Sequence, residues 1–137
     1  MFLTKECDYG IRVIRALSNG RKKNVKEICD AEHVPGQYAY KILKKLERAG
    51  LVRSLRGRDG GYRLVKPLDT FFIHDIVTAI DENLFVFECL LDDRLCPLNP
   101  NRGDPCTIHI EYDRIQTALV AEMQRTPMSK LFEHLLV

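Results

Sequence analysis

The sequence has no apolar run near the length of about 20 residues that a membrane-spanning helix needs. Its first residues do not show the basic and apolar segments of a secretory signal. Internal repeats and low-complexity segments are also absent, and the odd count of five cysteines argues against a disulfide scaffold. These absences predict a cytoplasmic protein with reduced thiols and no contact with a membrane.

Acidic residues are scarce in the first half of the chain. The basic half, residues 1–66, contains 16 Lys or Arg against 7 Asp or Glu, a balance of +9. The acidic half, residues 67–137, contains 5 against 12, a balance of −7, so the net charge of +2 conceals the asymmetry. Because a basic surface attracts a polyanion, the basic half is the predicted DNA-binding domain. The acidic half is the predicted sensing and dimerisation part.

The spacing of apolar residues predicts three helices in the basic half. The first follows Thr4 as its N-cap and ends near Gly20, the second covers about residues 25–32, and the third ends at Gly50. Two short strands then surround a glycine-rich tip at 56–61. Two helices joined by a tight turn and followed by a hairpin are typical of a winged helix-turn-helix.

The hairpin is the predicted wing of this fold. Its strands are expected at 51–55 and 62–65, and we expect Gly60 and Gly61 to adopt positive φ between them. The chain is therefore predicted to be mainly α-helical with one small β-hairpin wing and a long C-terminal dimerisation helix.

The acidic half is predicted to hold a sensing loop and the helices of a dimer interface. A short helix is expected at about 72–80, the cysteine-bearing loop at 81–106, a longer helix at about 107–125 and a last short helix after Pro127. The longer helix has an apolar stripe made of Ile108, Tyr112, Ile115, Leu119 and Met123. In a chain this short, we expect a helix of a second subunit to cover that stripe.

The third helix is expected to enter the major groove of double-stranded DNA. Gln can bond an adenine edge, and Lys favours guanine or phosphate. Base contacts are therefore expected from the start of the helix and phosphate contacts from its later lysines. The predicted contacts are Gln37, Tyr38, Tyr40, Lys41, Lys44 and Lys45.

Three cysteines and a histidine lie close together in the acidic half, namely Cys89, Cys96, Cys106 and His109. Structural zinc sites usually pair ligands at short spacing, whereas six and nine residues separate these cysteines. The spacing favours an iron–sulfur cluster held by a loop, with structural zinc or unoccupied thiols as alternatives. A cysteine enzyme is disfavoured because no orienting third group accompanies Cys106 and His109. The remaining thiols, Cys7 and Cys29, fall on apolar helix faces and are interpreted as buried hydrophobes.

These features resemble the Rrf2 family of bacterial transcription regulators over nearly the whole chain. The strongest match is 49–57 followed by 60–64, and Leu3, Thr4, Asp8 and Tyr9 match as well. The cysteine cluster with His109 is similar to the cluster-binding branch of the family, because members without a cluster usually lack all three cysteines. The gap between Cys96 and Cys106 is longer than in the best-known members.

The resemblance implies a homodimer whose binding to a partly palindromic operator is controlled by a two-iron or four-iron cluster on the three cysteines. It implies that Arg56, assisted by Arg58, reaches the minor groove. It also implies that the fourth ligand is His109 or an Asp8 that comes from the other subunit, and His33 beside the third helix is a further candidate. The alternative is a family repressor without a cluster that responds to thiol chemistry, a small molecule or a partner protein.

Overall fold

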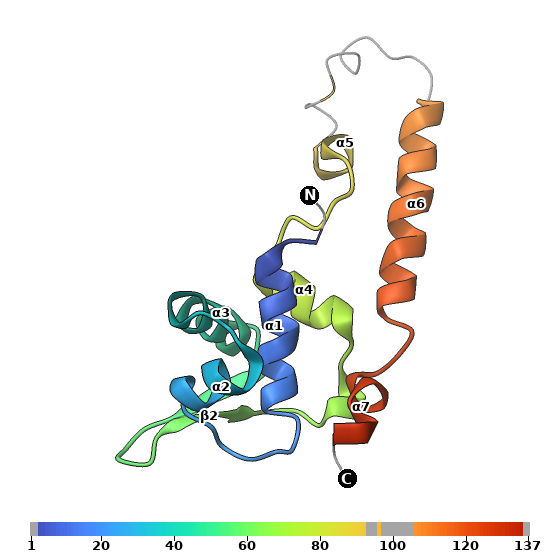
Figure 1. Cartoon of the computed structure of the whole chain (residues 1–137). Coiled ribbons are helices and arrows are strands. Elements are labelled where there is room, and N and C mark those ends of the chain that lie inside the picture. The colour runs from blue at the N-terminus through green and yellow to red at the C-terminus, as the bar shows by residue number, and fades with distance from the viewer. Residues whose placement is uncertain (1–2, 93–95, 97–105, 136–137) are drawn as a thin grey trace.

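The structure is a computed structural model that describes residues 3–92, 96 and 106–135 (Figure 1). The predicted sensing loop at 81–106 therefore lies partly outside the described residues. The elements are α1 (Lys5–Ala16), α2 (Val25–Glu32), α3 (Gly36–Arg48), β1 (Val52–Leu55), β2 (Gly61–Leu64), the 3-10 turn η1 (Leu68–Thr70), α4 (Ile73–Ile80), α5 (Glu88–Leu91), α6 (Thr107–Met123), α7 (Met128–Leu131) and the 3-10 turn η4 (Glu133–Leu135). The prediction of a mainly helical chain with a two-stranded hairpin is confirmed.

The first two helices begin at side-chain caps that the sequence supplies. The Thr4 hydroxyl accepts a hydrogen bond from the backbone N–H of Cys7 and so starts α1. At the start of α2, Asn24 and Glu27 form a capping box in which each side chain accepts from the other's backbone N–H. Such caps satisfy backbone donors that the first helical turn leaves without partners.

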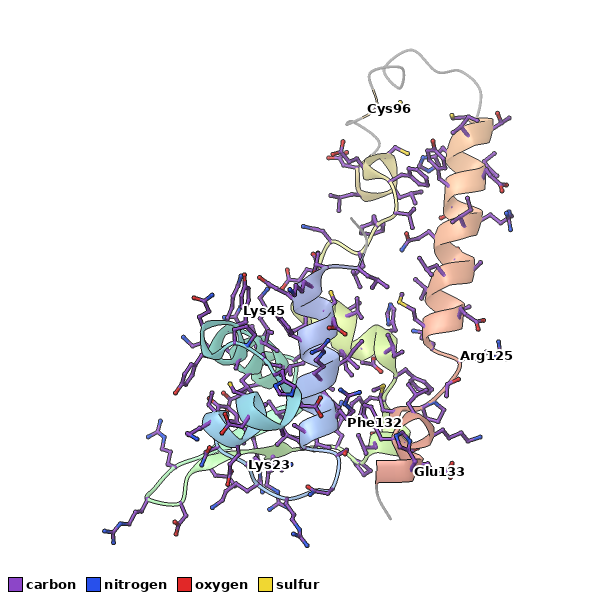
Figure 2. All side chains as sticks on the ribbon, viewed as in Figure 1. Lys23, Lys45, Cys96, Arg125, Phe132 and Glu133 are labelled. Carbon is purple, nitrogen blue, oxygen red and sulfur yellow. The ribbon has the colours of Figure 1, made fainter. Side chains whose placement is uncertain are left out.

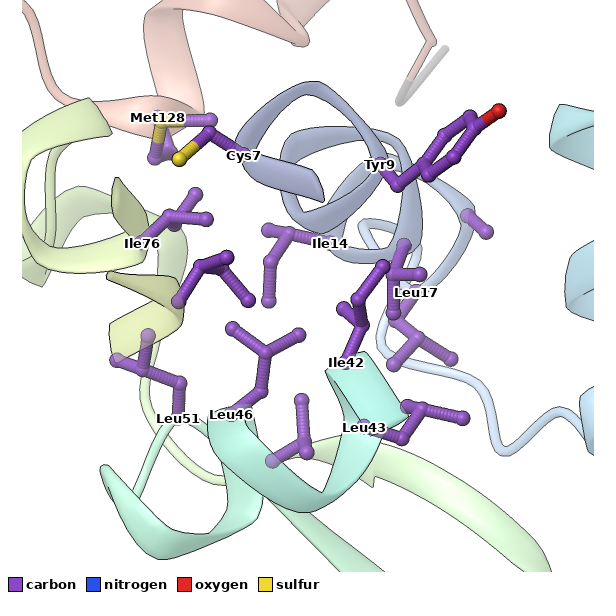
Figure 3. Packing of buried hydrophobic residues seen from close by; sticks show 14 of the residues in the cluster. Cys7, Tyr9, Ile14, Leu17, Ile42, Leu43, Leu46, Leu51, Ile76 and Met128 are labelled. Carbon is purple, nitrogen blue, oxygen red and sulfur yellow. The ribbon is translucent and has the colours of Figure 1, made fainter. Parts of the chain in front are cut away.

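The core lies where α1, α3 and α4 pack against one another (Figure 3). Ile14, Leu46 and Ile76, one from each helix, are fully buried there. Gly10 allows α1 and α4 to approach closely, because a Cβ at this position would lie 2.9 Å from Cγ1 of Ile80. Since α4 belongs to the acidic half, the two halves of the chain share this core.

The wing is an antiparallel pair in which Val52 is opposite Leu64 and Leu55 is opposite Gly61. The prediction of positive φ at Gly60 and Gly61 is wrong, because Gly57 is the glycine of the hairpin with that geometry, at φ 114°. Gly61 is required for a different reason. A Cβ there would lie 2.7 Å from the carbonyl oxygen of Lys23, so the side chain must be absent for two backbones to meet.

The long helix α6 stands apart from the core, beyond α4 (Figure 1). None of the residues of this helix is buried in the described part of the single chain. After α6 the chain returns to the core, where the backbone N–H of Met128 donates to the carbonyl of Phe71 at 3.0 Å and the Met128 side chain is fully buried. Among the described residues, no helix is long and apolar enough to cross a membrane.

Candidate DNA interface and candidate metal centre

One face of α3 is available to a ligand, and the opposite face is fixed in the core. The buried face consists of Ala39, Ile42, Leu43 and Leu46. The exposed face consists of Gln37, Tyr40, Lys41, Lys44 and Arg48. Tyr40 is 63% exposed, which is unusual for a large aromatic side chain and is consistent with a contact surface. Four of the six residues of α3 that were predicted to contact DNA therefore lie on the exposed face, and the other two, Tyr38 and Lys45, are half-buried.

Tyr38 has a different environment from its neighbours on α3. It is half-buried, and its ring lies 5.4 Å from the ring of Tyr9, measured between centroids, at an interplanar angle of 49°. The pair joins the first turn of α3 to α1. Tyr38 thus helps to fix the start of the helix, and its contact with a base stays a prediction.

Two lysines of α3 are bound by one carboxylate. Nζ of Lys41 lies 2.8 Å from Oε1 of Glu6, and Nζ of Lys45 lies 3.3 Å from Oε2. Lys45 also donates to the carbonyl oxygen of Ile80 at 2.8 Å, where α4 ends. The hydrogen bond from Lys41 holds the pKa of Glu6 below its usual value, so the carboxylate is ionised at neutral pH.

The turn between α2 and α3 is held by arginines of α1. Arg15 and Glu32 form an ion pair with Nη2 and Oε2 2.5 Å apart, and Arg12 donates to the backbone carbonyl of Glu32 at 3.3 Å. The next residue, His33, ends α2 in the left-handed conformation with φ 52°. His33 is exposed, and it lies just before α3 as the sequence predicts.

Arg56 and Arg58 lie between the two strands of the wing, and both are exposed. The hairpin extends away from the helices of the core (Figure 1). The Lys22 ammonium donates to the carbonyl of Asp59 and joins the hairpin tip to the segment before α2. At the base of the wing, Glu47 of α3 accepts hydrogen bonds from β1, which lower the pKa of its carboxyl group. These contacts fix the wing relative to α3, so both can approach one duplex.

Cys89 of α5 and Cys106 and His109 at the start of α6 lie at the end of the molecule where these two helices are in contact (Figure 1), and Figure 2 shows Cys96 at the same end. The five cysteines, all within the described residues, are thiols rather than disulfides, and Cys89, Cys96 and Cys106 are each half-buried. The sulfur of Cys106 is the N-cap of α6 and accepts from the backbone N–H of His109 at 3.4 Å. A helix N-terminus stabilises negative charge, so this position suits a thiolate ligand.

The segment that leads to Cys89 is attached to α6 by side-chain contacts, and Leu84 in this segment is buried in the core. The side-chain amide of Gln116 donates to the carbonyl of Leu84 at 2.8 Å and accepts from the N–H of Val86 at 2.9 Å. The ring of Phe87 stacks on that of Tyr112, with centroids 3.5 Å apart. The cysteine of α5 and the cysteine at the start of α6 are therefore carried by one structural unit.

Asp8 is placed on α1 and pairs with Arg12, whose Nε lies 3.0 Å from Oδ2 of Asp8. Within residues 3–92, 96 and 106–135 of a single chain, no three His, Cys, Asp or Glu side chains form a group that could hold a metal ion. The chemistry of the thiol set fits a cluster, but the described ligands do not form an assembled site.

The profile of the Rrf2 family, described as iron-dependent transcriptional regulator, matches residues 3–134. The chain belongs to the Rrf2 family. Protein aau3 of Rhizobium meliloti (strain 1021) is 37% identical over 106 residues, which cover 75% of this chain and 69% of that protein. Rrf2 proteins are transcription regulators and not enzymes, so the prediction that this chain is not an enzyme is confirmed.

Solved structures share the fold over nearly the whole chain. The structure of T. potens IscR has a TM-score of 0.76 at 16% identity and covers 97% of this chain and 87% of its own. The oxidized form of Staphylococcus aureus CymR has a TM-score of 0.71 at 21% identity and covers 96% of this chain and 95% of its own. The structure of CymR (YrzC), the global cysteine regulator of B. subtilis, has a TM-score of 0.73 at 20% identity and covers 96% of this chain and 96% of its own. These likenesses establish the Rrf2 winged-helix fold, and the predicted winged helix-turn-helix is confirmed.

The sequence did not indicate three contacts that organise the candidate sites of this Rrf2 protein. Glu6 binds two lysines of α3, Lys45 donates a hydrogen bond to a carbonyl of α4, and Gln116 bonds to the segment before Cys89. A polar side chain at one position of an otherwise ordinary amphipathic helix gives no sign of a partner far away in sequence. The tertiary structure is needed to find such pairs.

Proposed function

We propose that this Rrf2 regulator binds a partly palindromic operator under the control of an iron–sulfur cluster held by Cys89, Cys96 and Cys106. The observation that carries the proposal is the position of the half-buried thiols where α5 meets the start of α6, apart from the winged-helix core. Thiolates are the usual protein ligands of such clusters. The fourth ligand is His109 of the same chain, Asp8 of another chain, or His33. As a regulator of transcription, the protein acts in the cytoplasm.

When bound, a two-iron or four-iron cluster supplies a centre that reacts with oxidants or nitric oxide. The residues of the chain supply the connection from that centre to DNA. The segment with Cys89 continues directly from α4, whose last carbonyl accepts a hydrogen bond from Lys45 of α3. A displacement of this segment therefore acts on the helix that is proposed to enter the major groove.

The proposed contacts with DNA are those of the exposed face of α3 and of the wing. Gln37, Tyr38 and Tyr40 are assigned to base edges, Lys41 to a guanine edge or a phosphate, and Lys44 to phosphate. Arg56 and Arg58 are assigned to the minor groove. The positive charge of the basic half supports this orientation of the chain on DNA.

We further propose that α6 mediates a homodimer. Ile108 is 56% exposed, Ile110 is 57% exposed and Ile115 is 37% exposed in the single chain. Ile108 and Ile115 lie seven positions apart and so share one face of α6. Exposed isoleucines are unfavourable in water, and a second copy packed on that face would remove these two from solvent. A two-fold dimer places two copies of α3 on successive half-sites, which explains the expected symmetry of the operator.

The decisive experiment is an anaerobic absorption spectrum with iron and acid-labile sulfide analysis on freshly purified protein. We expect a visible charge-transfer band, and we expect it to be lost in Cys89→Ser, Cys96→Ser and Cys106→Ser. Cys29→Ser is the matched control, because Cys29 lies on α2 among core residues and its spectrum should equal that of the parent. Asp8→Asn, His33→Gln and His109→Gln then identify the fourth ligand.

A second candidate function is a regulator of the same family that has no cluster and responds to thiol oxidation, a small molecule or a partner protein. It is favoured by the absence of an assembled ligand group among the described residues and by the likeness to a CymR structure in an oxidized form. A colourless protein that resists reconstitution with iron and sulfide would support this second function and contradict the first.

A further inference from the structure

Glu6 connects the first turn of α1 to the helix that is proposed to contact DNA. Its two carboxylate oxygens are 2.8 Å from Nζ of Lys41 and 3.3 Å from Nζ of Lys45. The carboxylate side chain is 25% exposed, so it is partly shielded by the helices around it. One acidic residue of the basic half thus holds two positive charges of α3.

The two lysines differ in how firmly they are held. The Lys45 side chain is 30% exposed and has a second partner, the carbonyl oxygen of Ile80, at 2.8 Å. The Lys41 side chain is 55% exposed and lies on the same face of α3 as Gln37 and Lys44. Lys45 is therefore a fixed structural cation, whereas Lys41 can leave Glu6 without opening the core.

We propose that Glu6 competes with the DNA backbone for Lys41 and thereby sets the part of DNA affinity that does not depend on sequence. A carboxylate oxygen occupies the position on the ammonium group that a phosphate oxygen would take. An exposed ion pair is weak, so a phosphate of DNA can displace the carboxylate from Lys41. The binding free energy then gains only the difference between the phosphate contact and the carboxylate contact that it replaces. Removing the charge of Glu6 leaves Lys41 available to DNA.

The inference rests on the DNA-binding part of the proposed function and is independent of the cluster. The bond from Lys41 also keeps Glu6 ionised, because it lowers the pKa of this carboxyl group, and the bond raises the pKa of Lys41 in return. Both partners are therefore charged over the neutral pH range in which DNA binding is measured.

The test compares Glu6→Gln, Lys41→Gln and the double variant with the parent, all as full chains without added iron. Fluorescence anisotropy measures their affinity for an operator duplex and for a duplex of unrelated sequence over a series of salt concentrations. For Glu6→Gln we expect an affinity about three- to tenfold higher on both duplexes at low salt. We also expect the slope of log affinity against log salt to steepen by about 0.9, the value of one added phosphate contact.

Glu122→Gln is the matched control. It removes the same charge at the far end of α6, where Glu122 pairs with Arg125 at 2.7 Å and 66% of its side chain is exposed. An equal gain in Glu6→Gln and Glu122→Gln would mean that net charge alone acts and would overturn the proposal, as would a loss of affinity in Glu6→Gln. A gain that survives in the double variant with Lys41→Gln would also overturn it.

If Glu6→Gln fails to fold, which a thermal melt shows, Lys41→Gln in the otherwise unchanged chain still decides the matter. For Lys41→Gln we expect the slope of log affinity against log salt to fall by less than half of the value of one phosphate contact, because Glu6 already neutralises this lysine in the parent. A loss as large as that of Lys44→Gln, on the same face of α3, would overturn the proposal. A parent protein that binds neither duplex, both without iron and after reconstitution with iron and sulfide, would instead contradict the proposed function.

Discussion

Replacing Gly61 with alanine should break the contact between the wing and the segment before α2. The new Cβ would lie 2.7 Å from the carbonyl oxygen and 2.8 Å from the carbonyl carbon of Lys23. Both are backbone atoms, so the clash cannot be relieved by rotating a side chain. The strand must instead move away from the segment before α2.

The cost of this movement can be worked out from the bonds that it breaks. Tyr62 N–H donates to the Lys23 carbonyl at 2.8 Å, and Lys23 N–H donates to the Tyr62 carbonyl at 3.0 Å. Each bond contributes about 1 kcal/mol to stability. Alanine in place of glycine stabilises the folded protein by about 0.4–1 kcal/mol, because it lowers the conformational entropy of the unfolded chain. We expect a net loss of about 1–2 kcal/mol, which lowers the melting temperature by about 3–7 °C in a chain of this length.

Thermal melts followed by circular dichroism measure the loss, and Gly36→Ala provides a matched control with the opposite sign. A Cβ at Gly36 meets nothing within 4 Å, and the residue lies in the first turn of α3, so this variant should gain about 0.4–1 kcal/mol. DNA affinity should fall in Gly61→Ala because Arg56 loses its position relative to α3. Equal stability of Gly61→Ala and the parent would refute the argument that the wing depends on this close backbone approach.

Three further predictions follow from single contacts. Gln116→Leu should release the segment at 84–86 from α6, giving faster amide hydrogen exchange there and faster alkylation of Cys89, whereas Gln124→Leu at the other end of α6 should change neither. Hydrogen bonds from β1 hold the pKa of Glu47 below its usual value near 4.5, so the stability that it contributes is present above that value and lost as the pH falls through the lowered pKa. Acid titration of stability should therefore be flatter in Glu47→Gln, and an unchanged titration curve would contradict the assignment. Arg56→Gln should reduce the salt slope of DNA binding by about 0.9 and weaken binding most on operators with a narrow, A·T-rich minor groove, and equal weakening on G·C-rich duplexes would contradict a minor-groove contact.

The sequence by itself determined the elements of the winged helix and the family. Helix periodicity, the N-cap at Thr4 and the stop at Gly50 are local signals, because each depends on neighbours within one or two turns. The predicted second helix, at about 25–32, matches α2 residue for residue. The candidate cysteines could be named from spacing and residue type, which need no tertiary information.

Only the tertiary structure decided which partners these residues have. Gly61 is needed for contact with Lys23, which lies 38 positions earlier, and the positive φ of the hairpin is at Gly57 instead. Lys41 and Lys45 were both predicted to contact DNA, but only Lys45 is fixed within the protein. A carboxylate on α1 and a carbonyl on α4 hold its ammonium group in place. Contacts between distant segments depend on how helices pack, and packing depends on the shape of the whole core rather than on any local pattern.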